Sequence, residues 1–346
     1  MFLPELTEAC HKAAEAETLK GGGASIERPL RAPSGRSIDG RVLPTVRKGG
    51  RKNANIAIRP GSRPQEVDVD MQDDRPVLAR PEFPRSSRYD AGWMLGNQMG
   101  PNALWLLEWL CERLPIAAGA RVLDLGCGKA MTSVFLAKEF GAHVHAVDLW
   151  MDPDHNWRRA VEAGVADRVC PLRAEAHALP FAAGYFDAIV SIDAFHYFGT
   201  DLLYVDYLAR FLRPGGLLGV VVPGLVRPLA SGPPLWLTEP QSNGKVFWDD
   251  SCRSFLTAEA WRTLWAGSPF VSAVSVDAQP DGWRHWSDFE RAIEASGTGL
   301  FPSDAEALEK DAGRTMTFLR LLGSRTGVAG ENFYDPTLGL RAGAER

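Results

Sequence analysis

The sequence predicts an α/β fold whose centre is a doubly wound, mostly parallel β-sheet. Short apolar segments alternate with segments of helical spacing between Arg121 and Gly224, a pattern typical of parallel β-α units with helices on both faces of a sheet. A glycine-containing turn, Gly126-Cys127-Gly128, joins the first apolar segment to the first helical one. After Gly224 the alternation loosens, so we expect a variable C-terminal α+β lobe.

The individual elements follow from the spacing of the apolar residues. We expect strands at 121–127, 143–149, 168–174, 186–193 and 217–224, and helices at 131–140, 156–164 and 200–212. One strong helix, 103–114, precedes the sheet, with Pro101 and Asn102 near its start. In the C-terminal lobe we expect helices at 256–266 (with Thr257 as N-cap) and 281–295, a strand at 270–279, and a segment that starts with a Ser303–Glu306 capping box.

The chain of 346 residues is expected to contain four regions. Residues 21–63 carry ten Lys or Arg and eight glycines but few large apolar side chains, so burial cannot offset their ordering entropy. We therefore expect residues 1–80 to be a disordered basic extension; a basic arm for nucleic acid and a translation start at Met71 are the alternatives. Residues 84–224 are the core with its lead-in helix, 225–322 the C-terminal part, and 323–346 a flexible tail.

The bulk composition gives no attraction to polyanions or membranes. The net charge is −5 and the pI about 5.9, so we expect no nucleic-acid and no membrane partner. The five cysteines are scattered without metal-site or redox spacing, so we expect no metal and a reduced, cytoplasmic setting. The chain shows no secretory signal and no uncharged apolar run long enough for a transmembrane helix.

The segment Val122–Gly128 (VLDLGCG) is the most informative motif. Glycines permit a tight turn and let a ligand approach bare backbone. Dinucleotides use this geometry in a Gly-x-Gly-x-x-Gly motif, with the pyrophosphate at a helix N-terminus. Met131 stands at the third glycine position of that motif. Met131 at this position therefore disfavours a nicotinamide dinucleotide without excluding it.

The surrounding motifs resemble those of the class I S-adenosylmethionine (SAM)-dependent methyltransferases. Asp124, Gly126 and Gly128 match the family's first motif, a strand with an acidic residue followed by Gly-x-Gly-x-Gly. Ala130 replaces the third glycine, and since alanine ordinarily adopts helical or extended dihedrals, we expect the loop to differ there. The segments YFDAIVSID and LRPGGLLGVVVP match the fourth and fifth strands. The resemblance implies a Rossmann-like methyltransferase fold, SAM as cofactor and methyl transfer.

The resemblance also implies which residues bind SAM. Asp148 would bind both ribose hydroxyls, because a carboxylate can accept two hydrogen bonds; the alternative is a helix cap or a solvated acid. Glu175, or the backbone beside it, would contact the adenine, unless it is an ordinary surface glutamate. The complete candidate set is Asp124, Gly126, Cys127, Gly128, Asp148, Leu149, Glu175, Ala176 and Asp193.

Methyl transfer from a sulfonium depends mainly on in-line alignment and exclusion of water. A general base is needed only when the acceptor must lose a proton. His196 is the candidate base, with a packing role as the alternative, and Asp193 would bind the cofactor or orient the substrate. Both belong to the segment that follows the fourth strand. Further candidates for lid and substrate contacts are Tyr89, Asn97, Gln98, Tyr197, Trp283 and Trp286, for which capping or core packing is the alternative.

The leading hypothesis is methyl transfer from SAM to a small-molecule acceptor. One alternative is a lipid methyl or methylene transferase, although no basic amphipathic surface helix is visible. A nucleic-acid enzyme would be expected to carry Asn/Asp-Pro-Pro-aromatic where SIDAFHYF stands. A SAM-binding regulatory module without catalysis is the non-enzymatic alternative. We expect a monomer or homodimer; the acceptor and the methylated atom have no signature in the sequence.

Overall fold

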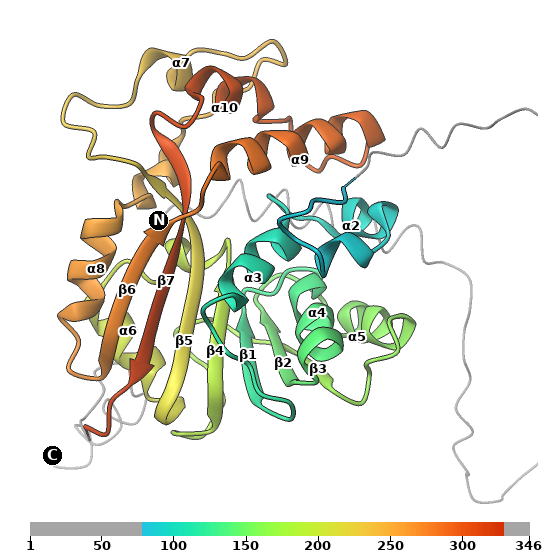
Figure 1. The fold of residues 1–346 in the computed structure, drawn as a ribbon, viewed down its shortest axis with the longest axis vertical. Coiled ribbons are helices and arrows are strands. Elements are labelled where there is room, and N and C mark those ends of the chain that lie inside the picture. Colours follow the sequence, from blue (N-terminus) through green and yellow to red (C-terminus); the bar gives the residue numbers. More distant parts are fainter. Residues whose placement is uncertain (1–77, 329–346) are drawn as a thin grey trace, which may run out of the picture. The chain divides into compact units, whose positions relative to one another are not determined.

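The computed structural model describes residues 78–328 (Figure 1). The predicted disordered extension 1–80 and flexible tail 323–346 therefore fall largely outside the described residues. The described part is built on a seven-stranded sheet of order β3-β2-β1-β4-β5-β7-β6, in which β7 runs antiparallel to both of its neighbours. The pairings among β1 to β5 are all parallel. The predicted mostly parallel, doubly wound sheet is confirmed.

The strands and helices have well-defined bounds. The strands are β1 Arg121–Leu125, β2 His143–Asp148, β3 Val169–Arg173, β4 Phe186–Ile192, β5 Leu212–Leu225, β6 Val271–Ala278 and β7 Met316–Arg325. The helices are η1 Ser86–Arg88, α2 Ala91–Asn97, α3 Ala103–Cys111, α4 Met131–Phe140, α5 Pro153–Glu162, η2 Phe195–Tyr197, α6 Leu202–Ala209, α7 Leu235–Thr238, η3 Asp250–Ser254, α8 Ala258–Ala266, α9 Gly282–Ser296 and α10 Ala305–Asp311. None of these helices is long and apolar enough to cross a bilayer.

Helices cover both faces of the sheet (Figure 1). Successive strand residues point to opposite faces, so neighbours on β1 join different cores. Val122 packs in the cluster that contains residues of α3, α4 and α9, whereas Leu123 packs in the cluster that contains residues of α6 and α8. Burial on both faces explains why the central strands read as nearly continuous apolar runs.

Two predicted helix starts are confirmed by their caps. The Asn102 Oδ1 accepts hydrogen bonds from the backbone N–H groups of Leu104 and Trp105, at 3.1 and 3.3 Å. The Thr257 hydroxyl accepts from the N–H of Ala260 at 3.2 Å. Each cap supplies an acceptor to N–H groups that have no partner within the helix.

The segment from Ser303 to Arg325 differs from its prediction. The capping box is not formed: the Ser303 hydroxyl accepts from the N–H of Ala305, and the Glu306 carboxylate accepts from the N–H of Ser242. Helix α10 ends at Asp311, and the chain then forms β7, which continues past the predicted tail boundary at 323. Strand β7 pairs with β5 and β6 at its two edges, and its first eight residues are buried on both faces. Its sequence therefore lacks the alternation that marks an exposed strand.

The strand order fixes where a ligand can enter the sheet. The connection after β3 carries the chain back across β1 to β4, so the order reverses between β1 and β4. In open α/β sheets a crevice forms at such a reversal, at the carboxyl ends of the strands. The loops that follow β1, β2, β3 and β4 converge there.

Candidate functional site

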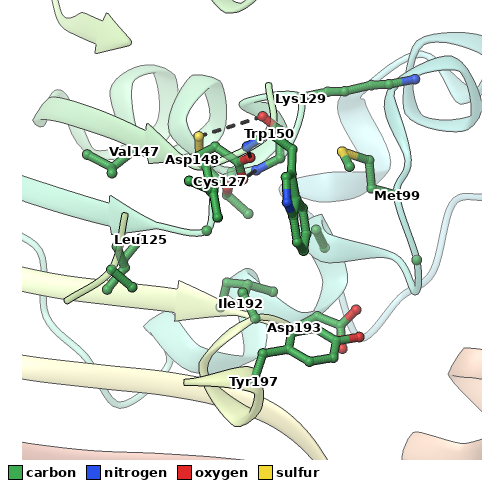
Figure 2. Close-up of a pocket in the computed structure, with 18 of the residues that line it drawn as sticks. Met99, Leu125, Cys127, Lys129, Val147, Asp148, Trp150, Ile192, Asp193 and Tyr197 are labelled. Atoms are coloured by element: carbon green, nitrogen blue, oxygen red, sulfur yellow. Dashed lines mark hydrogen bonds between the residues drawn. The ribbon is translucent and has the colours of Figure 1, made fainter. Parts of the chain in front are cut away.

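A cavity of about 270 Å³ lies at the carboxyl ends of β1 to β4; we call it the switch-point pocket. Figure 2 shows Asp148, at the end of β2, and Trp150 on one side and Asp193 and Tyr197, which follow β4, on the other. Asn97, the last residue of α2, and Met99, in the segment between α2 and α3, close the pocket. The remaining lining residues are Gly100, Pro101, Ala103, Leu125, Gly126, Cys127, Gly128, Lys129, Met131, Thr132, Val147, Leu149, Ala174, Glu175, Ala176, His177, Ile192, Ala194, Phe198 and Phe301.

Two glycines shape the loop after β1. Gly126 has φ +75°, and a Cβ built on it would lie 2.4 Å from the Cβ of Ala194. Gly128 has φ +51°, and its Cβ would lie 2.9 Å from the Met99 sulfur. Both backbone conformation and space therefore require glycine. The loop presents bare backbone to the pocket, as a cofactor-binding turn must.

Ala130 corrects one expectation about this loop. Alanine was expected to keep ordinary dihedrals and so to change the loop shape. Instead Ala130 has φ 58° and ψ 24°, which is the left-handed conformation, and it forms the N-cap of α4. This conformation costs a non-glycine residue about 1–2 kcal/mol. The loop thus keeps the path that a third glycine would give, with local strain.

Asp148 connects the loop after β1 to the loop after β2. Its Oδ2 accepts a hydrogen bond of 2.9 Å from the N–H of Gly128. Its Oδ1 accepts from the N–H groups of Trp150 and Met151, at 2.8 and 3.1 Å. A carboxylate has about four acceptor positions, so one position on Oδ2 remains for a ligand hydroxyl. The residue is 7% exposed and lines the pocket.

Asp124 does not line the switch-point pocket, in contrast to its predicted role. One of its oxygens accepts hydrogen bonds from the hydroxyls of Thr132 and Ser133, at 2.6 and 2.5 Å, and the residue is fully buried. Burial raises the pKa of Asp124 to about 6, against the opposing effect of the two hydroxyls. Because β1 points this side chain beneath the loop, Asp124 ties β1 to α4 and supports the loop from below.

The other predicted cofactor residues lie at the pocket. Gly126, Cys127, Gly128, Leu149, Glu175, Ala176 and Asp193 all line it. The Glu175 carboxylate is turned toward His177, whose backbone N–H and Nδ1 both lie 2.8 Å from it. An adenine contact at this point would therefore involve the backbone and Ala176 more directly than the Glu175 carboxylate. Cys127 is buried, and burial raises the pKa of its thiol, so it acts as a small apolar wall.

The segment after α2 covers the pocket, as the predicted lid would. The Asn97 Nδ2 donates to the carbonyl of Trp93 at 2.9 Å, and its Oδ1 accepts from the Arg159 guanidinium at 2.7 Å. Lys129 donates to the carbonyl of Gly96 at 3.3 Å. These bonds fasten the segment to α5 and to the glycine loop.

Gln98 and Tyr89 lie in different surroundings. Gln98 lines a neighbouring cavity and donates to the carbonyl of Thr298 at 3.2 Å. Tyr89 lines neither cavity: its ring packs on Trp93 and Phe135, and its hydroxyl bonds to Glu139 at 3.3 Å. Burial raises the pKa of Tyr89. Tyr89 thus anchors the lead-in segment to α4 instead of contacting a ligand.

The neighbouring cavity, of about 370 Å³, extends between the loop after β4 and the C-terminal lobe; we call it the lobe pocket. It shares a wall with the switch-point pocket, made of Met99, Gly100, Pro101, Asp193, Tyr197 and Phe301. Trp286 lines it, as predicted for a substrate contact. Trp283 lines neither cavity; its indole packs against Gly313, where an added Cβ would lie 2.4 Å away.

Asp193 lies in the wall between the two cavities. Its φ of 55° is left-handed, a conformation that aspartate adopts more often than most residues other than glycine. One carboxylate oxygen approaches Gly100 so closely that a Cβ there would be 2.8 Å away. Burial, and then the charge of Glu290, raise the pKa of Asp193 to about 8. A carboxyl with a perturbed pKa in a cavity wall is a candidate functional group.

His196 lines the lobe pocket but is poorly suited to accept a proton. The residue is 1% exposed, and its Nδ1 has no hydrogen-bond partner within the described residues. Burial lowers its pKa to about 3, far from the neutral value that suits a general base. Its ring packs between Tyr197 and Phe255, with centroids 3.9 and 5.5 Å away. The packing alternative for His196 fits this environment better.

Glu290 is a site residue that the sequence analysis missed. It lines the lobe pocket from α9, and burial, and then the charge of Asp304, raise its pKa to about 7. A signal was present in the sequence: Glu290 is four residues after Trp286 and three before Ile293, which places it on the apolar face of the helix. A carboxyl on such a face is unusual unless it serves a site.

Comparison with known proteins defines the class of the central domain. Residues 122–216 match the family model for a methyltransferase domain. The chain is 35% identical over 116 residues to the methyltransferase GfsG of Streptomyces halstedii, covering 33% of this chain and 42% of that protein. It is 33% identical over 144 residues to the ubiquinone biosynthesis O-methyltransferase of Xylella fastidiosa, covering 40% and 57%. The chain thus spans about half the length of these curated relatives.

A solved structure shows the same fold. Geranyl diphosphate C-methyltransferase from Streptomyces coelicolor, in complex with Mg²⁺, a substrate analogue and S-adenosylhomocysteine, matches with a TM-score of 0.50 at 20% identity, covering 64% of this chain and 75% of that one. At this identity the likeness shows the fold alone. The family model, with the motifs it spans, identifies residues 122–216 as a methyltransferase domain.

The switch-point pocket fits SAM in shape and donor set. The backbone of Gly126 and Gly128 lines the pocket without side chains, and Asp148 keeps an acceptor position at the end of β2, where a ribose hydroxyl would lie. Apolar groups from Leu149, Ala176 and Ile192 offer surfaces for a purine ring. Among residues 78–328, no three His, Cys, Asp or Glu side chains are grouped so as to hold a metal ion.

Proposed function

We propose that this chain is an enzyme that transfers a methyl group from SAM to a small-molecule acceptor. The switch-point pocket would hold SAM and the lobe pocket the acceptor. The observation that carries this proposal is the wall common to the two cavities, with Asp193 and Tyr197 at its centre. In-line displacement needs the nucleophile, the methyl carbon and the sulfur on one line, and two adjoining pockets can impose that alignment.

The residues of the switch-point pocket would divide the binding of SAM between them. Asp148 would accept a hydrogen bond from the ribose, and the backbone of Gly126 to Gly128 would lie against the ribose and methionine parts. Leu149 and Ala176 would enclose the adenine. Bound SAM supplies an electrophilic methyl carbon on a positively charged sulfur. The segment Asn97–Pro101 covers both pockets and would exclude water from the line of transfer.

Asp193 is better suited than His196 to handle a proton from the acceptor. The pKa of Asp193 lies near neutral pH and that of His196 far below it, and a proton acceptor works best when its pKa is close to the working pH. Asp193 also reaches both pockets, whereas His196 lines only the lobe pocket. We therefore assign the role of proton acceptor to Asp193 and a packing role in the wall of the lobe pocket to His196.

The size of the lobe pocket supports a small-molecule acceptor. Its volume of about 370 Å³ falls within the range of sites that enclose drug-sized ligands. The names of the relatives, which refer to ubiquinone biosynthesis and to geranyl diphosphate, agree with an acceptor of this size. The monomeric or homodimeric state and the cytoplasmic location remain predictions.

Calorimetric titration of the purified chain with SAM, with S-adenosylhomocysteine and with NAD tests the proposal. We expect micromolar binding of the first two ligands and no binding of NAD. A folded protein that binds neither SAM nor its demethylated product would contradict the proposal. Binding without turnover of SAM in the presence of amine, alcohol, thiol and carbon acceptors would instead favour a regulatory SAM-binding module.

A further inference from the structure

The lobe pocket has an excess of acidic side chains. Its carboxyl groups, its lysine and its histidine come from four parts of the chain: Asp193 and His196 after β4, Lys245 and Asp249 in the loop after α7, Glu290 on α9, and Asp304 before α10. The four carboxyl groups face a single lysine. This excess of carboxyl groups favours a positively charged ligand in the cavity.

Two of the four carboxyl groups already have a charged or hydrogen-bonding partner. Asp304 forms an ion pair of 2.8 Å with Lys245. Asp249 is exposed and accepts hydrogen bonds from the N–H and hydroxyl of Ser251 at the start of η3. The two groups that remain are Asp193 and Glu290. Within residues 78–328, neither forms an ion pair with a lysine, arginine or histidine side chain.

Asp193 and Glu290 are close enough to influence each other. The charge of Glu290 raises the pKa of Asp193, in addition to the larger effect of burial. Glu290 accepts a hydrogen bond of 3.3 Å from the N–H of Asp304, and the charge of Lys245 opposes the rise in the Glu290 pKa without cancelling it. Two partly buried carboxylates that face the same cavity repel each other and retain protons that exposed groups would release. A cation between them would offset this repulsion.

The rest of the wall is suited to the same kind of ligand. Tyr197, Phe247, Phe255, Trp286 and Phe301 bring aromatic rings to the cavity. Aromatic faces attract cations, most strongly where water is excluded. The buried His196 ring adds an Nδ1 that has no partner among the described residues. An unpartnered polar atom in a cavity wall indicates that a ligand completes the site.

We propose that the acceptor is an amine that binds as its ammonium ion between Asp193 and Glu290, against the aromatic wall of the lobe pocket. The proposal rests on the proposed methyl transfer and names its substrate class. Asp193, which reaches both pockets, would be the carboxylate nearest the methyl group. Glu290 would hold the ammonium from the lobe side and touch no part of SAM.

The reaction balances with these residues and SAM alone. The ammonium gives one proton to the Asp193 carboxylate, which exposes the nitrogen lone pair. The lone pair forms the N–C bond while the C–S bond breaks, and the C–S electron pair remains on sulfur. The products are a methylated ammonium ion, a neutral thioether and a protonated Asp193, which returns its proton to solvent. No oxidant, reductant or metal is required.

The test compares three probes of similar shape on protein saturated with S-adenosylhomocysteine: 2-phenylethylamine, 2-phenylethanol and 3-phenylpropionate. We expect the amine to bind with a Kd of about 1 mM or tighter, the alcohol at least about tenfold more weakly, and the acid not at all. Equal binding of amine and alcohol, or preference for the acid, would overturn the inference. The same titrations without S-adenosylhomocysteine show whether the cation site depends on the cofactor.

Glu290→Gln and Glu294→Gln form a matched pair of variants on α9. Glu294 is half-exposed and pairs with Arg291 at the surface, so its substitution should change nothing. Glu290→Gln should weaken amine binding about tenfold or more and leave the affinity for S-adenosylhomocysteine unchanged. Unchanged amine binding in a folded Glu290→Gln protein would contradict the amine proposal. Absence of S-adenosylhomocysteine binding in the wild-type protein would contradict the methyltransferase function instead.

The pH dependence of amine binding provides a second readout. The raised pKa values mean that at least one carboxyl must lose a proton before it can pair with the cation. Amine affinity should therefore rise between pH 6 and pH 8, with release of a proton that calorimetry in buffers of different ionisation enthalpy detects. A flat profile would show that the carboxyl pair does not hold the ammonium. Titration with Mg²⁺ in place of the amine checks the same site for a metal ion, and tight Mg²⁺ binding would also overturn the proposal.

Discussion

The Asp148 carboxylate accepts a 2.9 Å hydrogen bond from the backbone N–H of Gly128. This bond joins the ends of two neighbouring strands, β1 and β2, at the floor of the switch-point pocket. One side chain therefore both shapes the glycine loop and keeps an acceptor for a ligand hydroxyl. The two roles make Asp148 the position at which structure and cofactor binding are most closely coupled.

Asp148→Ala should weaken binding of SAM and S-adenosylhomocysteine by more than about tenfold, because a ribose hydroxyl and the N–H of Gly128 both lose their acceptor. The measurement is calorimetric titration with S-adenosylhomocysteine. Asp167→Ala, at an exposed aspartate beyond α5, is the matched control and should bind as the wild type does. Unchanged affinity in a folded Asp148→Ala protein would remove the ribose assignment.

Gly126→Ala and Gly119→Ala should differ although both residues have positive φ. At Gly119 an added Cβ meets nothing within 4 Å, whereas at Gly126 it lies 2.4 Å from the Ala194 Cβ. Gly119→Ala should cost about 1 kcal/mol for backbone conformation alone. Gly126→Ala should lower the Tm further and abolish S-adenosylhomocysteine binding, as differential scanning fluorimetry with and without ligand would show. Equal effects of the two variants would contradict the close packing of the loop.

Ala130→Gly should stabilise the protein. The left-handed conformation of Ala130 costs an L-residue about 1–2 kcal/mol, which glycine avoids. Part of this gain is offset because glycine loses more conformational entropy on folding than alanine does. A gain on the order of 1 kcal/mol in the free energy of unfolding should appear in urea denaturation. A loss of stability would mean that Ala130 adopts another conformation in solution.

Asp193→Asn should stabilise the ligand-free protein more at pH 8 than at pH 5. Because the folded-state pKa of Asp193 is raised, the folded protein keeps a proton that the unfolded chain releases from about pH 4 upward, so stability falls as pH rises toward 8. Asparagine removes this dependence, tolerates positive φ, and should gain on the order of a few kcal/mol at pH 8. The charged groups and histidines that share a cavity with Asp193 are His196, Lys245, Asp249, Glu290 and Asp304 in the lobe pocket and Lys129, Asp148, Glu175 and His177 in the switch-point pocket.

Thermal unfolding of wild type and Asp193→Asn from pH 5 to pH 8 provides the measurement. The two Tm curves should converge toward acid and separate toward alkali. Parallel curves would show that the Asp193 carboxyl titrates as an exposed group does. The isosteric substitution keeps the shape of the pocket wall, and a change in packing alone would separate the two curves by the same amount at every pH.

The sequence predicts the first five strands well because each has a strong local signal. An apolar run ends at a turn, and an amphipathic helix follows at the expected spacing. The signal weakens where tertiary contacts decide the structure. Strand β7 pairs with β5 and β6, which come from distant parts of the chain. Helix α2 is short, and its start depends on the Asp90 side chain accepting from the N–H of Trp93.

The site residues also fall into those that a local signal predicts and those that tertiary packing places. Residues that follow the strand ends, such as Asp148 and Asp193, lie at the pocket because the topology brings those ends together. Asp124 was placed at the cofactor although its side chain points beneath the loop, a distinction of strand face that the motif does not carry. Glu290 was missed because only the packing of α9 brings it to the loop after β4.

The antiparallel strand β7 has a consequence for the order of assembly. Strand β6 has no partner in the sheet other than β7, and α9 and α10 lie between them in the chain. During synthesis, β1 to β5 can pair as they emerge, because domains form from their N-terminal parts onward. The half of the molecule that holds most of the switch-point pocket can thus take shape first, and the lobe pocket is completed only when α9 and the segment before α10 pack against it.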